Sequence, residues 1–299
     1  MSKRAITPVE LAALWADYTA FRVGQIARST AVRDYRKIAR RIERMVHEAD
    51  HITNAIDVRN WLMCEYSADT ARRTLVQLNA CCRWAKESEM LDINPLDGIQ
   101  RHIRKPPPGQ RSCTPFTPEE RDVIIQTFRE RGSPYLAWVR FLFWTGCRPE
   151  EARALRWSDH IAGDFSEILF EEAWPMAVDQ PQAIKNYKAT RFPVNERLKA
   201  LLRGLRIRDE GWVFTGPKGA PMDYSNFQDR HWKPTVRRLA ARGDVAFYLP
   251  QYHCRHTWIT LALRAGMGVA DVSYLARVSP GVIWSNYAGR SQKITVPEF

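Results

Sequence analysis

The sequence predicts a mainly helical protein with a small antiparallel sheet, divided into two domains. Residues 7–100 carry apolar positions at helical spacing throughout. Three consecutive prolines, residues 106–108, then interrupt the chain and favour an extended linker. The remaining residues combine helical segments with short apolar stretches typical of strands. We therefore expect a helical domain over residues 1–100, a basic linker over 101–113 and an α+β domain over 114–299, a length sufficient for two cores.

Four amphipathic helices are expected in the first domain, over about residues 9–21, 29–48, 54–66 and 69–87. Ser29 and Thr30 have the side chains that usually cap a helix N-terminus, so they are expected to begin the second helix. Its apolar residues fall on one stripe and are listed here: Tyr35, Ile38, Ile42 and Met45.

A second stripe of the same helix is basic and is nearly free of acids. It consists of Arg33, Arg36, Lys37, Arg40 and Arg44. The acids Asp34 and Glu43 are expected to point elsewhere. We interpret this stripe as a surface that follows DNA phosphates, although a charged stripe can also be a solvated face. Further candidate DNA contacts are Arg72 and Arg73 in the fourth helix and Arg104 and Lys105 in the linker.

The strand-like segments of the second domain are residues 167–170, 183–185 and 191–194. The last two are expected to form a hairpin around residues 186–190, and residues 171–181 are expected to connect the first strand to that hairpin. The other segments of the domain favour helices. One is introduced by Thr117, Pro118, Glu119 and Glu120, a typical helix start.

The composition favours a polyanionic partner. The chain has 45 Lys and Arg against 33 Asp and Glu, a formal net charge of +12 and a pI near 9.6. Nucleic acid and an anionic membrane surface both fit this charge. No apolar run approaches the ~20 residues that span a bilayer, and no apolar signal core follows residues 1–4. A cytoplasmic, nucleoid-associated protein is expected.

The cysteines and histidines do not predict a metal site. The six cysteines show no zinc-ligand spacing, and a reducing compartment favours free thiols. His253 and His256 lie three residues apart, but no second ligand pair is near them in the sequence. No metal and no cofactor are therefore expected.

Three motifs suggest a common chemistry. In the first, an apolar run ends at Thr145-Gly146, and Arg148 and Glu151 flank the start of a new helix marked by Pro149. The second contains Tyr252 and then Arg255-His256-Thr257. The third ends at Tyr287, close to the C-terminus.

In order and spacing, these motifs resemble those of the tyrosine recombinases, or phage-type integrases. The resemblance covers the C-terminal two thirds of the chain, and the N-terminal third is compatible with it. It implies a four-helix core-binding (SAM-like) domain followed by an α+β catalytic domain.

The resemblance also implies roles for individual residues. Arg148 and Arg255 would neutralise the charge that develops on a DNA phosphate, and Glu151 would orient Arg148. Tyr287 would be the nucleophile. Lys185 would protonate the leaving oxygen, with Lys188 as the alternative. His256 is a supporting residue.

Two positions depart from the family pattern. Tyr252 stands where a histidine is common, and Val278 stands where histidine or tryptophan is common. Valine donates no hydrogen bond, and losing one donor to a transition state costs on the order of 10²–10³ in rate. The hydroxyl of Tyr252 could still bond the phosphate or the nucleophile, so Tyr252 is included among the catalytic candidates.

The implied activity is site-specific DNA recombination, in which duplex DNA is cut and rejoined through a 3′-phosphotyrosyl intermediate without metal or ATP. Four subunits would act on two DNA sites, with a monomer or dimer otherwise, and accessory DNA-bending or directionality factors could assist. Two alternatives stay open. One is a catalytically impaired DNA-binding protein on the same scaffold, and the other is a relaxing enzyme similar to type IB topoisomerases.

Overall fold

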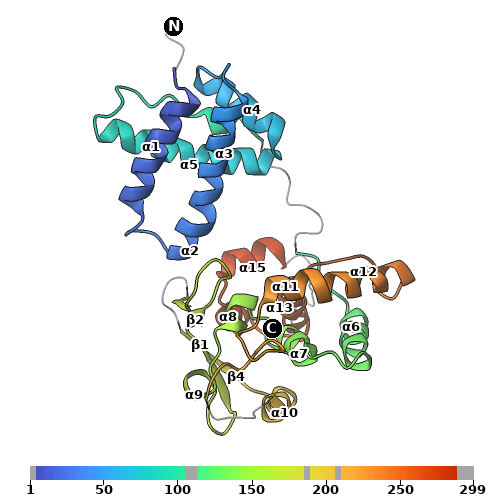
Figure 1. Cartoon of the computed structure of the whole chain (residues 1–299). Coiled ribbons are helices and arrows are strands. Elements are labelled where there is room, and N and C mark those ends of the chain that lie inside the picture. Colours follow the sequence, from blue (N-terminus) through green and yellow to red (C-terminus); the bar gives the residue numbers. More distant parts are fainter. Residues whose placement is uncertain (1–4, 105–112, 185–188, 206–209, 288–299) are drawn as a thin grey trace, which may run out of the picture. The chain divides into compact units, whose positions relative to one another are not determined.

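The computed structural model describes residues 5–104, 113–184, 189–205 and 210–287. The chain divides into two compact units, Met1–Gly109 and Gln110–Phe299. The first is helical, and the second combines helices with a small antiparallel sheet (Figure 1). The predicted fold class is confirmed. Among the described residues, no helix combines the length and the apolar character needed to cross a bilayer.

Unit 1 is built from four main helices. They are α1 (Pro8–Arg22), α3 (Arg36–Glu48), α4 (Ala55–Glu65) and α5 (Ala68–Glu87). The short helix α2 (Arg28–Thr30) and the π-helical turn η1 (Ala31–Tyr35) lead into α3, and the 3-10 turn η2 (Ile99–His102) ends the unit. Helix α1 packs against both α3 and α5. The predicted apolar stripe, from Tyr35 to Met45, is buried in this core.

Local capping explains where most of these helices begin. Thr7 forms a capping box with Glu10, and the Asn54 side chain accepts hydrogen bonds from two backbone N–H groups of α4. The prediction that Ser29 and Thr30 cap the second helix is wrong. That helix begins at Arg28 without a side-chain cap, and its π-helical turn brings Tyr35 against Trp15, with ring centroids 4.9 Å apart. The π-helical turn is thus stabilised by aromatic packing and not by a cap at Ser29 or Thr30.

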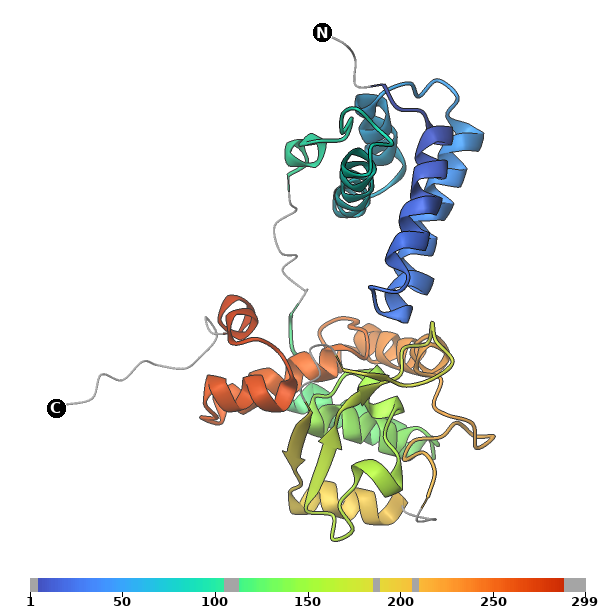
Figure 2. The same ribbon diagram turned by 90° about the vertical axis from the view of Figure 1, so that its left-hand side faces the viewer.

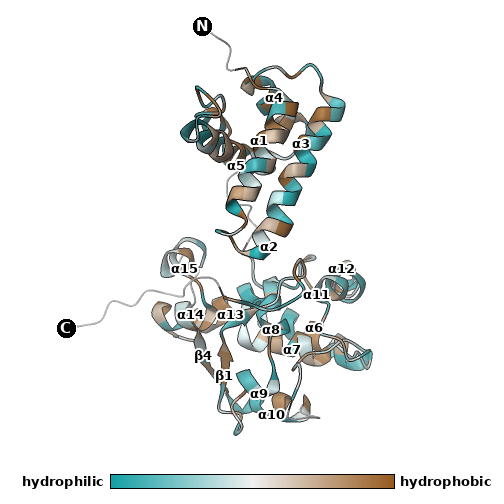
Figure 3. Cartoon of the chain, turned by 60° about the vertical axis from the view of Figure 1, so that its left-hand side comes forward, coloured by the Kyte–Doolittle hydropathy of each residue, from teal (hydrophilic) through white to brown (hydrophobic). Residues whose placement is uncertain are grey.

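Unit 2 has a core rich in aromatic side chains, centred on α7 (Leu136–Thr145). Nearly every face of α7 is apolar, so it is surrounded by other elements and most of its residues are buried. Its neighbours include α6 (Pro118–Glu130), α10 (Glu196–Leu205) and α13 (His253–Arg264). Figure 3 shows the apolar residues of these elements in brown.

The other helical segments of unit 2 are short. They are α8 (Pro149–Arg153), α9 (Trp157–His160), α11 (Tyr224–Phe227), the π-helical turn η4 (Gln228–Trp232), α12 (Lys233–Arg242), α14 (Val269–Ala276) and α15 (Pro280–Asn286). Helix α14 packs against both α13 and α15. The C-terminal helices thus form one layer of packed elements.

The strands pair in two short antiparallel ladders. In the first, β1 (Glu167–Phe170) pairs with β4 (Thr190–Pro193), with Glu167 opposite Pro193 (Figure 2). In the second, β2 (Glu172–Ala173) pairs with β3 (Gln182–Ala183). Since β2 follows β1 directly, residues 167–173 form one arm of a long hairpin.

The predicted pairing of residues 183–185 with residues 191–194 is therefore wrong, because β3 pairs with β2 and β4 pairs with β1. The described turn between the two arms lies at residues 174–181. Trp174 and Val178 are buried in this turn, and the indole N–H of Trp174 donates to the Val178 carbonyl at 3.0 Å. The packing of these two side chains stabilises the turn. From the sequence, residues 171–181 were expected only to connect one strand to the next. Lys185, Lys188 and the rest of residues 185–188 lie outside the described residues.

Gly146 ends α7 where the chain turns towards α8. It has φ +61°, and a Cβ at this position would lie 2.8 Å from the Cβ and Cγ of Trp258 on α13. Only glycine therefore allows α7 and α13 to approach this closely. Gly132, which follows α6, has a similar φ of +56°, but nothing lies within 4 Å of its Cβ position.

This pair of glycines separates backbone strain from steric overlap. Gly132→Ala should lower the free energy of unfolding by about 1–2 kcal/mol, the cost of a left-handed conformation. Gly146→Ala should lower it by about 2–4 kcal/mol, because overlap with Trp258 adds to that strain. Urea unfolding of the two variants measures the difference. Equal losses would show that Trp258 moves aside without cost.

Candidate active site

Arg148 is the N-cap residue of α8, where its extended backbone follows the Gly146 turn. Its backbone N–H donates to Glu151 Oε2 at 2.8 Å, and its guanidinium Nη1 donates to Glu151 Oε1 at 2.6 Å. Burial opposes the charge of Arg148, but Glu151, Tyr252 and Glu150 together outweigh burial and raise the pKa of Arg148. The side chain is 30% exposed, so this cation remains accessible to solvent.

Glu151 is only 1% exposed, and it is shared by two arginines. Arg277 Nη2 donates to Oε2 at 2.8 Å, while Arg148 occupies Oε1. Burial alone would raise the pKa of Glu151. The charges of Arg277 and then Arg148 outweigh burial and hold this pKa at about 2. Glu151 is therefore ionised throughout the neutral range.

Arg255, on α13, is held by main-chain carbonyls. Its Nη1 donates to the Gly146 carbonyl at 2.9 Å, and its Nη2 donates to the Ala276 carbonyl. The side chain is buried, and this burial, followed by the charge of Arg148, lowers the pKa of Arg255. An arginine so placed stays charged because its ordinary pKa is above 12.

The turn after α14 contacts both of these arginines. Its residue Arg277 has φ +52° and ψ +49°, and its carbonyl accepts from Arg148 Nη2 at 3.0 Å. Val278 N–H bonds to Ser273 O and Arg277 N–H to Tyr274 O, both at 3.1 Å, the two bonds of a Schellman motif. Glycine is the usual residue at this left-handed position, which costs other residues about 1–2 kcal/mol.

The Arg277 side chain folds back into the same cluster. Its guanidinium carbon lies 4.1 Å from the centre of the Phe170 ring, and its Nη1 donates to the Leu275 carbonyl at 2.7 Å. Sequence reasoning did not include Arg277 among the site residues. The sequence did contain a signal for Arg277: it directly follows a predicted helix, at a position where glycine is the usual cap.

Tyr287 follows α15 and packs in an apolar cluster with Ile259, Val272 and Ile283. Its side chain is only 5% exposed, and its hydroxyl is hydrogen-bonded to Nδ1 of His256. Burial is the main cause that raises the pKa of Tyr287 above its ordinary value, Cys113 adds to the effect, and Arg255 opposes it. The phenol is thus protonated at neutral pH in this arrangement.

The two departures from the family pattern lie beside this pair. Tyr252 is 39% exposed, and its ring centroid lies 5.4 Å from that of His256. Val278 packs against the apolar cluster that contains Tyr287 and brings no polar group to it. A ring with a hydroxyl is therefore available beside His256, while the valine position contributes only packing.

Thr257 has a structural function next to these residues. Its hydroxyl accepts from the Phe116 backbone N–H at 2.9 Å and donates to the His253 carbonyl at 2.8 Å. The ring of His253 is hydrogen-bonded through Nδ1 to the Thr114 carbonyl at 2.8 Å. These bonds attach the start of unit 2 to α13 and fix the helix that carries Arg255 and His256.

The structure thus brings Arg148, Glu151, Arg255, His256 and Tyr287 into one cluster with Tyr252. Lys185 and Lys105, two further predicted site residues, lie outside the described residues. Within the described ranges, no group of three or more His, Cys, Asp and Glu side chains is arranged to hold a metal ion.

In unit 1, the predicted basic stripe divides into two kinds of residue. Arg36, Lys37 and Arg40 are exposed and make no ion pair with any described residue. By contrast, Arg33 pairs with Asp34 at 2.9 Å, which corrects the expectation that Asp34 points elsewhere. Arg44 pairs with Glu48 at 2.7 Å and with Glu65 at 2.5 Å.

The remaining candidate DNA contacts also differ from one another. Arg73 pairs with Asp69 at 2.9 Å across one helical turn of α5. Arg72 is half-buried, whereas Arg104 is exposed after the last turn of unit 1. Arg36, Lys37 and Arg40 are therefore the strongest candidates for a phosphate surface.

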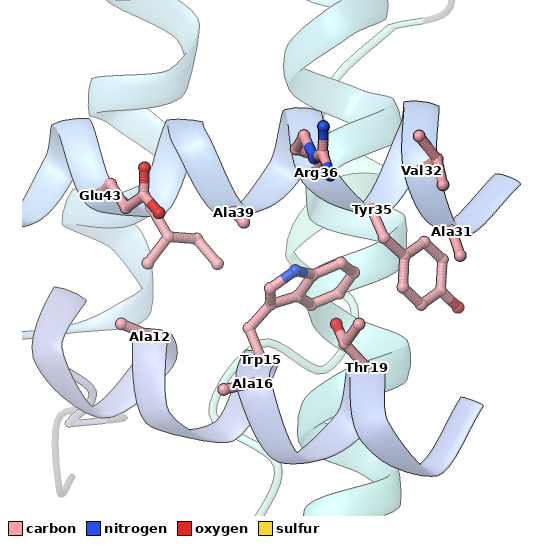
Figure 4. A pocket seen from close by; sticks show the side chains of 11 residues that line it. Ala12, Trp15, Ala16, Thr19, Ala31, Val32, Tyr35, Arg36, Ala39 and Glu43 are labelled. Atoms are coloured by element: carbon pink, nitrogen blue, oxygen red, sulfur yellow. The ribbon is translucent and has the colours of Figure 1, made fainter. Parts of the chain in front are cut away.

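A groove of about 440 Å³ lies between α1 and α3. The Trp15 indole lies between the two helices, and Arg36 points away from α1 (Figure 4). The indole N–H of Trp15 and the hydroxyl of Thr19 are buried there without a hydrogen-bond partner in the described part of the chain. None of the described catalytic candidates lines this groove, whereas Arg36 of the basic stripe does.

Comparison with solved structures identifies the fold. The integrase of the transposon Tn1549, in complex with a circular intermediate DNA, matches with a TM-score of 0.75 and 16% identity over 93% of this chain and 94% of that chain. Lambda integrase (residues 75–356) bound to DNA matches with a TM-score of 0.67 and 15% identity over 96% and 99%. The chain has the integrase fold.

A lambda integrase dimer bound to a COC′ core site also shares the integrase fold, with a TM-score of 0.69 and 14% identity over 98% of this chain and 81% of that chain. No protein-family model and no curated protein matches the sequence. The similarity to integrases is therefore one of fold, and it confirms the fold expected from the three sequence motifs.

The buried carboxylate of Glu151 makes the stability of the fold depend on pH. Since the pKa of Glu151 is about 2 in the folded chain and its ordinary value is 4.5, its ionisation stabilises the fold above pH 4.5. This stabilisation, about 3 kcal/mol, is lost as the pH falls from 4.5 towards 2. Glu151→Gln should therefore be much less stable than the wild type at pH 6, and the difference should shrink towards pH 2.

Denaturant unfolding between pH 2 and pH 6 measures this difference. Glu210→Gln is the control, because Glu210 is an exposed carboxylate of the same unit. A stability difference for Glu151→Gln that does not change with pH would show that the ion pairs do not stabilise the ionised carboxylate.

Proposed function

We propose that the protein is a site-specific DNA recombinase of the tyrosine recombinase family, which cuts and rejoins duplex DNA through a 3′-phosphotyrosyl intermediate. The observation that carries this proposal is the cluster of Arg148 and Arg255 with the hydrogen-bonded pair of His256 and Tyr287. The integrase fold and the net charge of +12 support it.

The proposed reaction transfers a phosphoryl group without metal or ATP. The Tyr287 oxygen attacks the phosphorus, a Tyr287–phosphate bond forms, and the bond to the 5′-oxygen of the next nucleotide breaks. Arg148 and Arg255 neutralise the added negative charge, which arginine can do because it keeps its charge and donates several N–H groups. Lys185 gives a proton to the leaving 5′-oxygen.

Proton removal from Tyr287 is assigned to His256. Burial keeps the phenol protonated, so the nucleophile must lose its proton as it attacks. Nδ1 of His256 is already hydrogen-bonded to the phenolic oxygen, which is the geometry that general-base catalysis requires. The Tyr252 hydroxyl, beside His256, is a further candidate contact for the phosphate or the nucleophile.

DNA binding is assigned to both units. Unit 1 would act as the core-binding domain, with the stripe of Arg36, Lys37 and Arg40 along the phosphates, and unit 2 would act as the catalytic domain. The partners would be duplex DNA in the cytoplasm and three further copies of the chain on two paired sites. Accessory DNA-bending or directionality factors are compatible with this scheme.

Tyr287→Phe should abolish covalent attachment to DNA and leave affinity within about threefold, because the hydroxyl forms the bond but is buried in the free protein. Full-length protein is incubated with a random-sequence duplex library, denatured, and analysed for DNA that stays attached. Captured sequences then provide a nicked duplex for single-turnover assays.

One control variant and two contrary outcomes give this experiment its meaning. Tyr274→Phe removes the hydroxyl of an exposed tyrosine of the same unit, which accepts from the Arg191 backbone N–H, and it should leave the adduct intact. Binding without any adduct by the wild type would support the catalytically impaired alternative, for which Tyr252 and Val278 are the motive. DNA relaxation by a monomer, without exchange between two sites, would support the topoisomerase-like alternative.

Replacing Arg36, Lys37 and Arg40 together with alanine should lower the salt dependence of DNA binding. The slope of log affinity against log salt should fall by up to about 2.7, since each phosphate contact contributes about 0.9. Arg33→Ala is the matched control, because Arg33 lies on the same stripe but is paired with Asp34. An unchanged slope in the triple variant would show that the stripe is a solvated face.

A further inference from the structure

Arg277 is the third arginine of the candidate active site, and its backbone and side chain both contact the site. It occupies a left-handed position, φ +52°, where a helix ends and where glycine is the usual residue. Its side chain is 5% exposed, so a long charged group is buried beside the reacting residues. An arginine at a position that suits glycine costs the fold backbone strain, and the contacts of its guanidinium offset that strain.

The guanidinium of Arg277 completes the binding of Glu151. Oε2 of Glu151 accepts from Arg277 Nη2 and from the Arg148 backbone N–H, both at 2.8 Å, so Oε1 is left for the Arg148 guanidinium at 2.6 Å. Because the two arginines bind different oxygens, Arg277 fixes the carboxylate without displacing Arg148.

The backbone of Arg277 acts on the other side of Arg148. Its carbonyl accepts from Arg148 Nη2 at 3.0 Å, and the preceding carbonyl, of Ala276, accepts from Arg255. Arg148 is therefore held at Nη1 by a carboxylate that Arg277 pairs with, and at Nη2 by the carbonyl of Arg277 itself.

Arg277 is too deeply buried to be the first group that a DNA phosphate meets. Arg148, with 30% of its side chain exposed, is accessible, whereas the Nε of Arg277 is buried and has no hydrogen-bond partner in the described residues. Phe170 covers one face of the guanidinium. Arg277 thus acts through its neighbours.

We propose that Arg277 is a positioning residue of the DNA-cutting centre, which holds Arg148 in place through Glu151 and through its own carbonyl. This inference rests on the proposed function. Arg277 also adds positive charge to a centre in which Val278 donates no hydrogen bond. The cluster of Arg148, Arg255, Arg277 and Glu151 has three arginines and one carboxylate, a formal charge of +2.

Loss of the Arg277 guanidinium would make the centre sensitive to acid. The groups that face Glu151 are Arg148 and Glu150 from α8, Cys147 before it, Arg255 from α13 and Arg277 after α14. Arg277 is the largest of the charges that lower the pKa of Glu151, so this pKa should rise when Arg277 is removed. A protonated Glu151 would release the Arg148 guanidinium, and cleavage would fall as the pH falls.

Arg277→Gly and Arg277→Lys test this role in the full chain. The probe is the nicked duplex obtained by covalent capture, and the readouts are the single-turnover rate of adduct formation at saturating protein and the dissociation constant. Arg277→Gly should bind within threefold of the wild type and form adduct about 10–100-fold more slowly, as expected when a catalytic group is misplaced. The wild-type to variant rate ratio should increase from pH 7.5 to pH 5.5.

Arg277→Lys keeps a cation near Glu151, so its rate should lie between those of the wild type and Arg277→Gly, with a ratio that stays constant over this pH range. It also provides the test if the glycine variant does not fold. The control is Arg264→Gln, which removes one exposed positive charge at the end of α13 and should leave the rate unchanged.

Three results would overturn the inference. One is a wild-type rate in Arg277→Gly, another is an equal loss in Arg264→Gln, and the third is a loss in Arg277→Gly whose ratio to the wild type is independent of pH and is not rescued by lysine. In each of these cases the wild type and Arg264→Gln still form adduct, so the proposed function stands. Absence of an adduct in the wild type itself overturns the proposed function and this inference together.

Discussion

The carboxylate of Glu151 carries a negative charge in a place that water hardly reaches. Such a charge is costly to bury unless it is paired and hydrogen-bonded. Two guanidinium groups and one backbone N–H satisfy it here, and they come from the start of α8 and the end of α14. The need to neutralise this one group therefore ties two distant parts of unit 2 together and determines where Arg148 lies.

Main-chain carbonyls complete this arrangement. Gly146, Ala276 and Arg277 supply the acceptors for Arg255 and Arg148. The Gly146 carbonyl reaches Arg255 because α7 approaches α13 closely. The carbonyls of Ala276 and Arg277 lie at the Schellman turn that ends α14. The positions of the Arg148 and Arg255 guanidinium groups thus depend on where α7 and α14 end and on how these helices pack.

The sequence predicted the parts of the structure that local chemistry controls. Capping residues such as Thr117 with Glu120, and the apolar stripe ending at Met45, indicated helices that the structure contains. The hairpin was misplaced because its turn is stabilised by Trp174, an apolar side chain that is not a turn residue. The ion pair of Arg44 with Glu65 joins different helices, so spacing along one helix could not show it. For the same reason, Arg277 was only a reserve candidate near Val278 from the sequence, which could not show its bond to Glu151.

The bond between Glu151 and Arg277 joins residues that are 126 positions apart, and the bond between Phe116 and Thr257 spans 141. A ribosome releases the N-terminal side of a chain first. Glu151 therefore emerges from the ribosome long before Arg277, the arginine that completes its set of hydrogen-bond donors. Helix α3 of unit 1 is likewise complete before Arg148 and Arg255 can come together. Under the proposed function, the chain acquires its DNA-binding surface earlier in translation than its DNA-cutting centre.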